Sequence, residues 1–491
     1  MAQECIHPPS AACLSASMRD LGYSLETSIA DLIDNSISAG ADTIEIYCDI
    51  ANEQPVVAII DNGIGMEKKQ LLIAMRHGAR SPKQSRTPQD LGRFGLGLKT
   101  ASFSQCRSLT VVSKRDGNTC GAEWDLDSID AVDDWVLSIL DDTDIQILPY
   151  LERLGSRGTA VIWRQLDRLM EDEEGDNRQE IVNDKLATVS RHLSLVFHRF
   201  ISGEIKGYPR ITLSLNGHII SGFDPFCKKN PATQILPEEI VRIGTDEVRI
   251  QPYVLPHHSH LSISEYTYYQ DRSNFISNQG IYIYRNGRLM VWGDWFRLTS
   301  KSEATKLARV QIDFPNSLDE AWTIDIKKSR AYPPLVIRER LRQIISQITA
   351  RSTIIHRGRG QKLYQEISSP IWERFADQSG IRYTLNCSHP ILQRLKECLD
   401  GEDIRHLELF IETASSSLPI EMMYSDYSTH PLEVKQAQSL QNVQGRLHDL
   451  RQAIWGNAIG SEETFRDIVR STRLFDDYME VVEEYIKREF I

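Results

Sequence analysis

Three short segments of the chain place polar residues and glycines where they could bind a phosphorylated ligand. In the first, Ser24 to Ile37, apolar residues recur at helical spacing, and Asp31 and Asn35 share the polar face four residues apart. A carboxylate and an amide oxygen stacked in this way can hold Mg²⁺ and orient a water molecule. The alternative is an ordinary amphipathic helix with a solvated face.

In the second segment, a buried-strand pattern ends in a carboxylate and a glycine turn. The apolar run 56–60 leads directly into Asp61, and Gly63 and Gly65 follow. An aspartate at the end of a strand can accept a hydrogen bond from an exocyclic amine, and glycines let a flat ring approach the backbone closely. Taken by itself, this pattern is equally compatible with a plain turn.

The third segment is rich in glycine and leads into a predicted helix. Gly92, Gly95 and Gly97 can surround phosphate oxygens with bare amides at a helix N-terminus, and Lys99 adds positive charge. The polar stretch before it, from Lys68 to Asp90, is predicted to form a movable lid over a nucleotide. A dinucleotide-binding fold would instead need the glycine loop immediately after its first strand.

Length and composition indicate the number of domains and the kind of protein that contains these segments. A chain of 491 residues predicts two to four domains. The eight cysteines form no CxxC pair, which predicts free thiols in a reducing compartment. No uninterrupted apolar run of about 18 residues occurs, so we expect a soluble, cytoplasmic protein without a membrane partner.

Charge is distributed unevenly along the chain. The net charge of −12 argues against a generally cationic protein that coats DNA. Residues 327–362, here called the basic segment, nevertheless contain ten Lys or Arg residues against one acid, Glu339. The basic segment predicts a polyanion partner, or alternatively a solvated helix face followed by a loop.

The wider pattern predicts three domains, at 1–200, 201–345 and 346–491. In the first, helical patterns alternate with short strands, which indicates an α+β sandwich. In the second, strands 211–215 and 281–284 each precede an Asn-Gly turn, which indicates a further α/β domain. The third is mainly helical, with an apolar stripe predicted to be core: Leu440, Val443, Leu447, Leu450 and Ile454.

In this order, and followed by Gly158 and Thr159 on a later strand, the three segments resemble the four nucleotide boxes of the GHKL superfamily. That superfamily, with its Bergerat fold, includes DNA gyrase B, MutL, large heat-shock chaperones, histidine kinases and MORC proteins. The resemblance covers residues 20–165. It implies a Bergerat α/β sandwich that binds ATP and Mg²⁺.

The resemblance also implies roles for individual residues. Asp61 would accept from the adenine amino group with help from Thr159, and Asn35 would bind Mg²⁺. Asp31 stands where hydrolytic members carry a glutamate that activates water. Because aspartate is one methylene shorter, hydrolysis is expected to be slow, and Asp31 acts either as the base or only in ordering water or metal. The other expected nucleotide contacts are Gly63, Gly65, Met66, Gly92, Gly95, Gly97, Leu98, Lys99 and Thr100.

The second domain is similar to the ribosomal-protein-like transducer domain of MORC-like members. The similarity lies in residues 279–289 and 322–331. In that family a loop lysine reaches the γ-phosphate and stabilises charge in the transition state. Lys328, or failing that Lys327, is the expected lysine here. The alternative is a solvated lysine pair at a strand end.

The expected function is that of an ATPase that works as an ATP-gated homodimeric clamp. About twenty residues before Leu25 leave no room for a histidine-kinase phosphoacceptor hairpin, and the 346–491 region is too short for the cleavage domains of a topoisomerase. One output is association with double-stranded DNA through 327–362, in a bacterial anti-phage defence operon with partner proteins. The alternative is a chaperone-like or scaffold ATPase acting on a protein partner. Only DNA binding would weaken steeply with salt.

Overall fold

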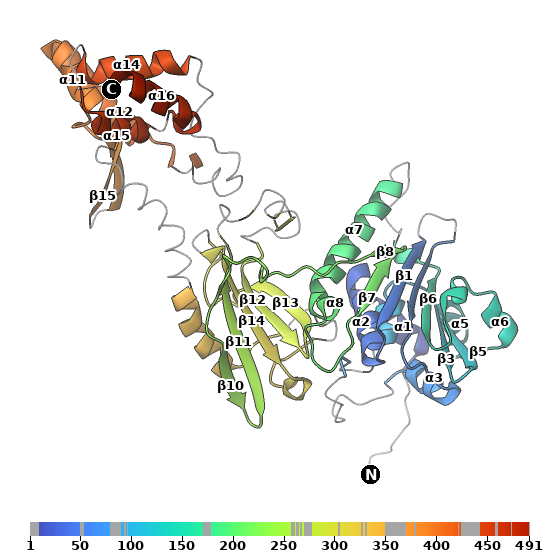
Figure 1. The fold of residues 1–491 in the computed structure, drawn as a ribbon. Coiled ribbons are helices and arrows are strands. Elements are labelled where there is room, and N and C mark those ends of the chain that lie inside the picture. The colour runs from blue at the N-terminus through green and yellow to red at the C-terminus, as the bar shows by residue number, and fades with distance from the viewer. Residues whose placement is uncertain are drawn as a thin grey trace. The chain divides into compact units, whose positions relative to one another are not determined.

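The computed structural model divides into two compact units, residues 1–352 and 353–491, and each is described separately (Figure 1). The described residues are 9–49, 54–78, 90–92, 95, 97–169, 178–256, 261, 265, 268–269, 277–302, 305–325, 328, 331–348, 370–377, 380–420, 422–423, 442–456, 460–472 and 474–490.

An eight-stranded mixed sheet organises the first part of unit 1. Its strand order is β5-β4-β3-β6-β2-β1-β7-β8, and the pairing is antiparallel except between β1 and β7. The strands are β1 Thr43–Asp49, β2 Val56–Asp61, β3 Ser108–Arg115, β4 Asn118–Asp125, β5 Leu137–Leu140, β6 Gly158–Arg164, β7 Thr212–Leu215 and β8 His218–Ile219.

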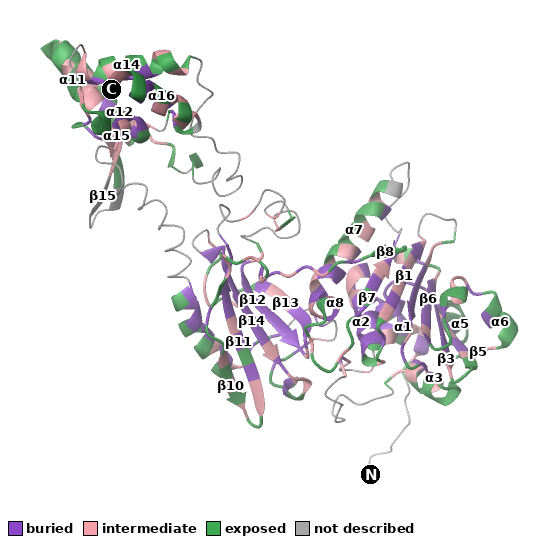
Figure 2. Cartoon of the chain, in the orientation of Figure 1, coloured by how far each residue is buried: buried purple, intermediate pink, exposed green. Residues whose placement is uncertain are grey.

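Side-chain alternation on β2 explains how this sheet is covered on both faces. Val57 and Ile59 belong to the large core beneath the helices, whereas Ala58 and Ile60 belong to a smaller core on the opposite face. Figure 2 shows the central strands as mostly buried. The helices that contribute to the large core are α1 Ala11–Arg19, α2 Leu25–Ser38, α3 Lys68–Met75, α4 Gly97–Phe103, α5 Leu126–Val132, α7 Arg178–Val196 and, through Phe200, the short α8 His198–Ser202, which follows α7. Helix α6 Asp142–Gln146 contributes Ile145 to the smaller core.

The hairpin β7–β8 lies in a different sheet from the one that the sequence predicts. It was expected in the second domain, but β7 pairs with β1, from Thr43 opposite Thr212 to Ile46 opposite Leu215. Ile211, Leu213 and Leu215 are buried in the large core of the first sheet. The hairpin therefore belongs to the first sheet, because its apolar residues pack in the large core of that sheet. The three domain limits remain predictions.

The start of the expected lid also differs from the prediction. Residues 68–75 form helix α3, and Leu71 and Met75 are buried in the large core. A helix anchored by two core residues cannot be the moving part, so the lid prediction is wrong for this portion. Residues 79–89 lie outside the described residues.

A second sheet forms the other part of unit 1, with order β10-β11-β14-β12-β13 and β9 paired to β11. The β12–β13 hairpin turns through Asn286 and Gly287, both with positive φ, as the Asn-Gly signal predicts. A helix over residues 335–348 follows. The strands are β9 Gln234–Ile235, β10 Glu239–Ile243, β11 Asp246–Val254, β12 Gly280–Arg285, β13 Arg288–Asp294 and β14 Ala308–Phe314.

Unit 2 contains helices and one hairpin that the helical pattern did not predict. Its helices are α11 Pro390–Cys398, α12 Gly401–Ser416, α14 Val443–Trp455, α15 Glu462–Thr472 and α16 Met479–Phe490, and its hairpin is β15 Trp372–Asp377 with β16 Gly380–Leu385. Leu447, Leu450 and Ile454 are buried, as predicted for the apolar stripe, and Leu440 lies outside the described residues.

Two bulk expectations can be compared with the described residues. None of the helices in the described ranges has the length and hydrophobicity needed to cross a membrane. All seven cysteines within those ranges are free thiols, as predicted.

Candidate functional site

Asp61 is the last residue of β2, and its carboxylate is surrounded by hydrogen-bond donors. Its Oδ2 accepts from Ser36 Oγ at 2.8 Å, and its Oδ1 accepts from the amides of Gly63 at 2.9 Å and Thr159 at 3.2 Å. Burial raises the pKa of Asp61, and these hydrogen bonds oppose the rise. The donors fix the carboxylate at the end of the strand, where it can accept from an exocyclic amine.

Two glycines near Asp61 occupy positions that no larger residue fits. Gly158 has φ +131°, and a Cβ there would lie 1.9 Å from the carbonyl oxygen of Asp61. Gly65 has φ +68°, and a Cβ there would lie 2.2 Å from the carbonyl oxygen of Lys114. Both backbone conformations disfavour side chains, so glycine is needed to bring these segments together.

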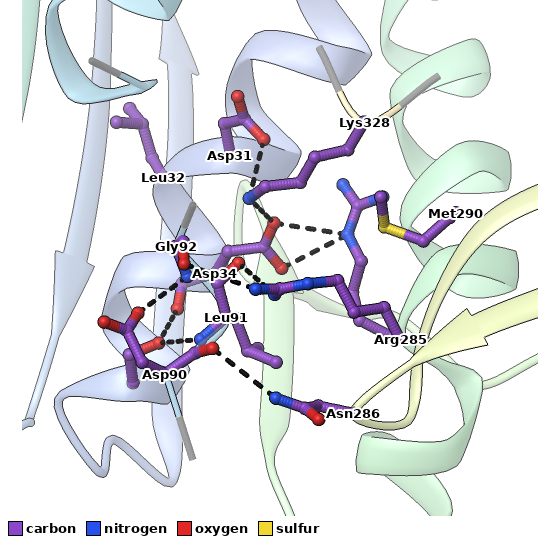
Figure 3. Close-up of polar contacts among 12 residues, drawn as sticks. Asp31, Leu32, Asp34, Asp90, Leu91, Gly92, Arg285, Asn286, Met290 and Lys328 are labelled. Carbon is purple, nitrogen blue, oxygen red and sulfur yellow. Dashed lines mark hydrogen bonds and ion pairs between the residues drawn. The ribbon is translucent and has the colours of Figure 1, made fainter. Parts of the chain in front are cut away.

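Asp31 is buried on α2 between a tyrosine hydroxyl and a lysine ammonium. Tyr23 donates its hydroxyl to Asp31 Oδ2 at 3.0 Å. Lys328 Nζ lies 3.1 Å from Asp31 Oδ1 (Figure 3). Burial raises the pKa of Asp31, and the positive charge of Lys328 opposes that rise. A buried carboxylate with a raised pKa and a charged partner is a candidate general base.

Lys328 also contacts a second acid, Asp34, so that four buried charges form a cluster. Lys328 Nζ donates to Asp34 Oδ2 at 2.5 Å, and Arg288 Nε lies 3.3 and 3.2 Å from the two oxygens of Asp34. All four side chains of this charge cluster, Asp31, Asp34, Arg288 and Lys328, are at most 8 % exposed. Two acids balance two cations, which offsets the desolvation of each.

Backbone geometry directs Lys328 into this cluster. Its φ is 55°, and its amide donates to the carbonyl of Asp325 at 3.2 Å. A left-handed conformation at a non-glycine residue is unfavourable and persists only where surrounding contacts enforce it. Lys328 is therefore buried and paired with two carboxylates, so the alternative prediction of a solvated lysine is wrong.

The β12–β13 turn contacts the segment before the glycine loop. Arg285 donates to the carbonyl oxygen of Leu91 at 2.9 Å while its other nitrogens hold Asp319 at 2.6 and 2.7 Å. Asn286 donates to the carbonyl oxygen of Asp90 at 3.5 Å, as Figure 3 shows. The second sheet thus contacts both α2 and residues 90–92.

The remaining predicted residues occupy different environments. Asn35 is exposed one helical turn after Asp31. Gly97 begins α4, and a Cβ there would lie 3.6 Å from Asp31 Oδ2, so the third glycine-rich segment adjoins Asp31. Thr100 is buried, and Met66 and Leu98 pack against the large core. The structure therefore brings Gly97 to Asp31 on one side and Thr159 to Asp61 on the other.

Lys99 points away from solvent in this structure. Its ammonium donates to the carbonyl oxygens of Ala74 at 2.8 Å and Gly95 at 3.2 Å. Burial lowers the pKa of Lys99 to about 8. Its expected part in the phosphate cradle stays a prediction, and the observed contacts join α3 to the glycine loop. Lys327, the second lysine predicted to reach the phosphate, lies outside the described residues.

A cavity of about 510 Å³ lies at the N-terminal end of α2, bordered by Arg19, Tyr23, Gln105 and Lys185 among others. Neither Asp61 nor Thr159 borders it, so it is separate from the predicted adenine position.

Four site residues were not singled out from the sequence: Tyr23, Asp34, Ser36 and Arg288. Asp34 and Ser36 flank Asn35, so the sequence places both on the predicted helix. It does not show which residues they contact. Arg288 lies 254 residues from Asp34, and Lys328 lies 294 residues from it. Only the proximity of α2 to the second domain, which the resemblance to the transducer implies, could have suggested these pairs.

The segment that contains Asp31 and Asp61 is similar to known proteins. Residues 23–159 match the family described as histidine kinase-, DNA gyrase B-, and HSP90-like ATPase. The chain is 36 % identical over 92 residues to ATPase morc-1 of Caenorhabditis elegans, covering 18 % of this chain and 10 % of that protein. It is 31 % identical over 93 residues to the DNA mismatch repair protein MutL of Elusimicrobium minutum, covering 18 % and 15 %.

A third relative, MutL of Buchnera aphidicola, is 36 % identical over 87 residues, which cover 17 % of this chain and 15 % of that protein. The chain therefore spans only a small part of these relatives, and all three matches are short. The matched family region begins at Tyr23 and ends at Thr159, so it contains Asp31, Asn35 and Asp61. Residues 23–159 therefore match a GHKL-type ATPase family, and the chain is similar to MORC and MutL proteins over short segments.

Proposed function

We propose that this protein is a Mg²⁺-dependent ATPase that works as an ATP-gated homodimeric clamp on double-stranded DNA. The observation that carries the proposal is the charge cluster. In it, Asp31 on α2, the candidate base, contacts Lys328, which follows the last strand of the second sheet in the chain. A base and a cation close to each other suit hydrolysis of a terminal phosphate, because one can activate water and the other can stabilise the developing charge.

In the proposed reaction, Asp31 accepts a proton from the water that attacks the γ-phosphorus of ATP. The bond from that phosphorus to the β–γ bridging oxygen breaks, and ADP and phosphate leave. Lys328 would move its ammonium from the two carboxylates to the γ-phosphate, where it stabilises the developing charge. Before this move Lys328 neutralises Asp31, so the base is withheld until ATP is bound.

Asn35 suits the proposed metal site because it is exposed one turn from Asp31. Its side-chain amide has no hydrogen-bond partner within the described ranges. Mg²⁺ prefers few protein ligands and completes its shell with phosphate oxygens and water. The described residues hold no cluster of three or more His, Cys, Asp or Glu side chains that could bind a metal by itself, which fits this arrangement. When bound, Mg²⁺ would neutralise phosphate charge.

The same contacts provide a route from ATP to dimer closure. Lys328 and Arg288 tie the second sheet to α2 through Asp34. Withdrawing Lys328 toward a phosphate would weaken that tie, so ATP would favour a different arrangement and shift its population. Light scattering with a non-hydrolysable ATP analogue should show a dimer, and a monomer at every nucleotide concentration would contradict the clamp.

The described part of the basic segment supports DNA as the partner. The helix over 335–348 buries Ile337 and Leu341, while Arg340 and Arg342 are exposed. Arg340 is paired with Glu239, which reduces the charge that it can offer to phosphates. A DNA role predicts that the logarithm of the binding constant falls linearly with the logarithm of salt concentration. Salt-insensitive behaviour would favour the chaperone-like or scaffold alternative.

The decisive experiment measures Mg²⁺-dependent ATP hydrolysis with and without double-stranded DNA. Asp31→Asn and Lys328→Ala should each abolish turnover yet retain ATP binding, and DNA should stimulate the wild type. Lys229→Ala, which removes an exposed lysine of the same unit, is the matched control and should behave as wild type. Unchanged turnover in both site variants would refute the assignment. A role in anti-phage defence predicts that Asp31→Asn also loses protection in a plaque assay.

A further inference from the structure

Tyr23 is the side chain that connects the candidate base to the glycine-loop helix. It immediately precedes α2, whose N-cap is Ser24, and it is 7 % exposed. Its hydroxyl donates to Asp31 Oδ2 at 3.0 Å. The hydroxyl of Thr100, on α4, hydrogen-bonds to Tyr23 in turn. A chain of hydroxyls therefore runs from α4 through Tyr23 to Asp31.

The backbone of Tyr23 is held by the residues that follow α4. Gln105 Nε2 donates to the carbonyl oxygen of Tyr23 at 3.1 Å, and the same amide group bonds to Ser104 Oγ at 3.0 Å. The hydroxyl of Tyr23 is thus linked to α4, and its backbone is linked to the residues directly after α4. Because α4 begins at Gly97, in the third nucleotide box, this element is the one that faces the predicted phosphates.

The chemical need for such a contact follows from the length of Asp31. An aspartate reaches less far than the glutamate expected at this position, so a small misorientation moves its oxygen out of line with the attacking water. Tyr23 holds Oδ2, and Lys328 lies at Oδ1. When Lys328 leaves, Oδ1 becomes the oxygen that can take the proton.

Tyr23 does not itself act as the base. Burial and the negative charge of Asp31 both raise its pKa, so its hydroxyl remains protonated and can only donate to the carboxylate. Donation to the charged form of Asp31 favours that form, so it opposes the rise in the pKa of Asp31 that burial causes.

We propose that Tyr23 is the positioning residue for Asp31, and that through Thr100 it makes the orientation of the base depend on the position of α4. This inference rests on the proposed ATPase function. It adds a connection from the phosphate-facing helix to the group that activates water.

The test compares kcat and KM of Tyr23→Phe with those of the wild type. We expect kcat to fall about ten- to hundredfold, with KM for ATP within about twofold of wild type because the hydroxyl contacts Asp31, which is proposed to act on water. The acid limb of the kcat profile should shift to higher pH, because Asp31 loses a donor to its charged form. Tyr253→Phe, which removes a similarly buried hydroxyl that contacts Gln311, is the control and should change none of these.

A second variant decides the case in which the first one does not fold. If Tyr23→Phe does not fold, Thr100→Val, which keeps the Tyr23–Asp31 contact and removes its link to α4, should still lower kcat.

Unchanged kcat in a folded Tyr23→Phe, or in Thr100→Val where only that variant folds, overturns the inference while the ATPase proposal stands. If the wild type hydrolyses no ATP, the proposed function itself fails, and the positioning role fails with it.

Discussion

Removing one member of the charge cluster should destabilise the protein far more than removing two of opposite sign. Asp34 accepts from Lys328 at 2.5 Å and from Arg288 at 3.2 Å, and it is fully buried. Asp34→Asn leaves two buried cations with one acid, so the cluster changes from neutral to a net charge of +1. Breaking a buried ion pair from one side costs about 3–5 kcal/mol.

Lys328→Met produces the opposite imbalance, with two acids facing Arg288. Because burial already raises the pKa of Asp31, that carboxyl can take up a proton and relieve part of the cost at low pH. The Asp34→Asn/Lys328→Met double variant again has one acid and one cation. Its loss should be about 2 kcal/mol, whereas adding the two single losses gives about 6 kcal/mol or more.

Urea unfolding of the nucleotide-free protein at neutral pH, followed by tryptophan fluorescence, measures all four proteins. Glu247→Gln is a suitable control, because its partner Arg242 is 78 % exposed and such a surface pair contributes about 1 kcal/mol or less. Single losses below about 1 kcal/mol, or a double variant whose loss equals the sum, would refute the charge-balance argument.

Three further predictions concern the rest of the site. Asp61→Asn should weaken ATP binding, measured by calorimetry, about ten- to hundredfold. Ser36→Ala should weaken it less, and Asp42→Asn, which changes an exposed residue, should leave it unchanged. Equal affinities for all three variants would place adenine elsewhere. Gly158→Ala should abolish ATP binding and lower the unfolding free energy, because its Cβ would lie 1.9 Å from the Asp61 carbonyl oxygen; a wild-type denaturation midpoint would contradict this. Lys99, with its pKa near 8 against a usual 10.5, binds fewer protons when folded than unfolded between these values, so it should add stability as pH rises from 8 to 10.5. Lys99→Met should lack this rise, and parallel pH curves for variant and wild type would show that the ammonium is not buried.

The local parts of the site could be predicted from the sequence because short-range patterns determine them. The apolar spacing around Asp31 predicts the helix found as α2, and the apolar run before Asp61 predicts β2. The third glycine box predicts a helix start, and α4 begins at Gly97. In each case the pattern and the chemistry occupy the same few residues.

The long-range contacts could not be predicted in the same way. Nothing near Asp34 specifies that its partners are Arg288 and Lys328, because helical periodicity reports burial and gives no information about the opposing element. The left-handed turn at Lys328 has no glycine or asparagine to signal it. The lid prediction failed in part because polarity alone concealed the two core residues of α3, Leu71 and Met75.

The parallel pairing of β7 with β1 has a consequence for any attempt to isolate the nucleotide-binding part. A fragment ending at residue 200 would lack β7 and β8, and the backbone groups of β1 from Thr43 to Ile46 would lose their partners. It would also lack Ile211, Leu213 and Leu215 from the core. Unpaired strand edges beside exposed apolar surface promote aggregation between copies, so a soluble fragment should extend at least to Ile220, which is itself buried in that core.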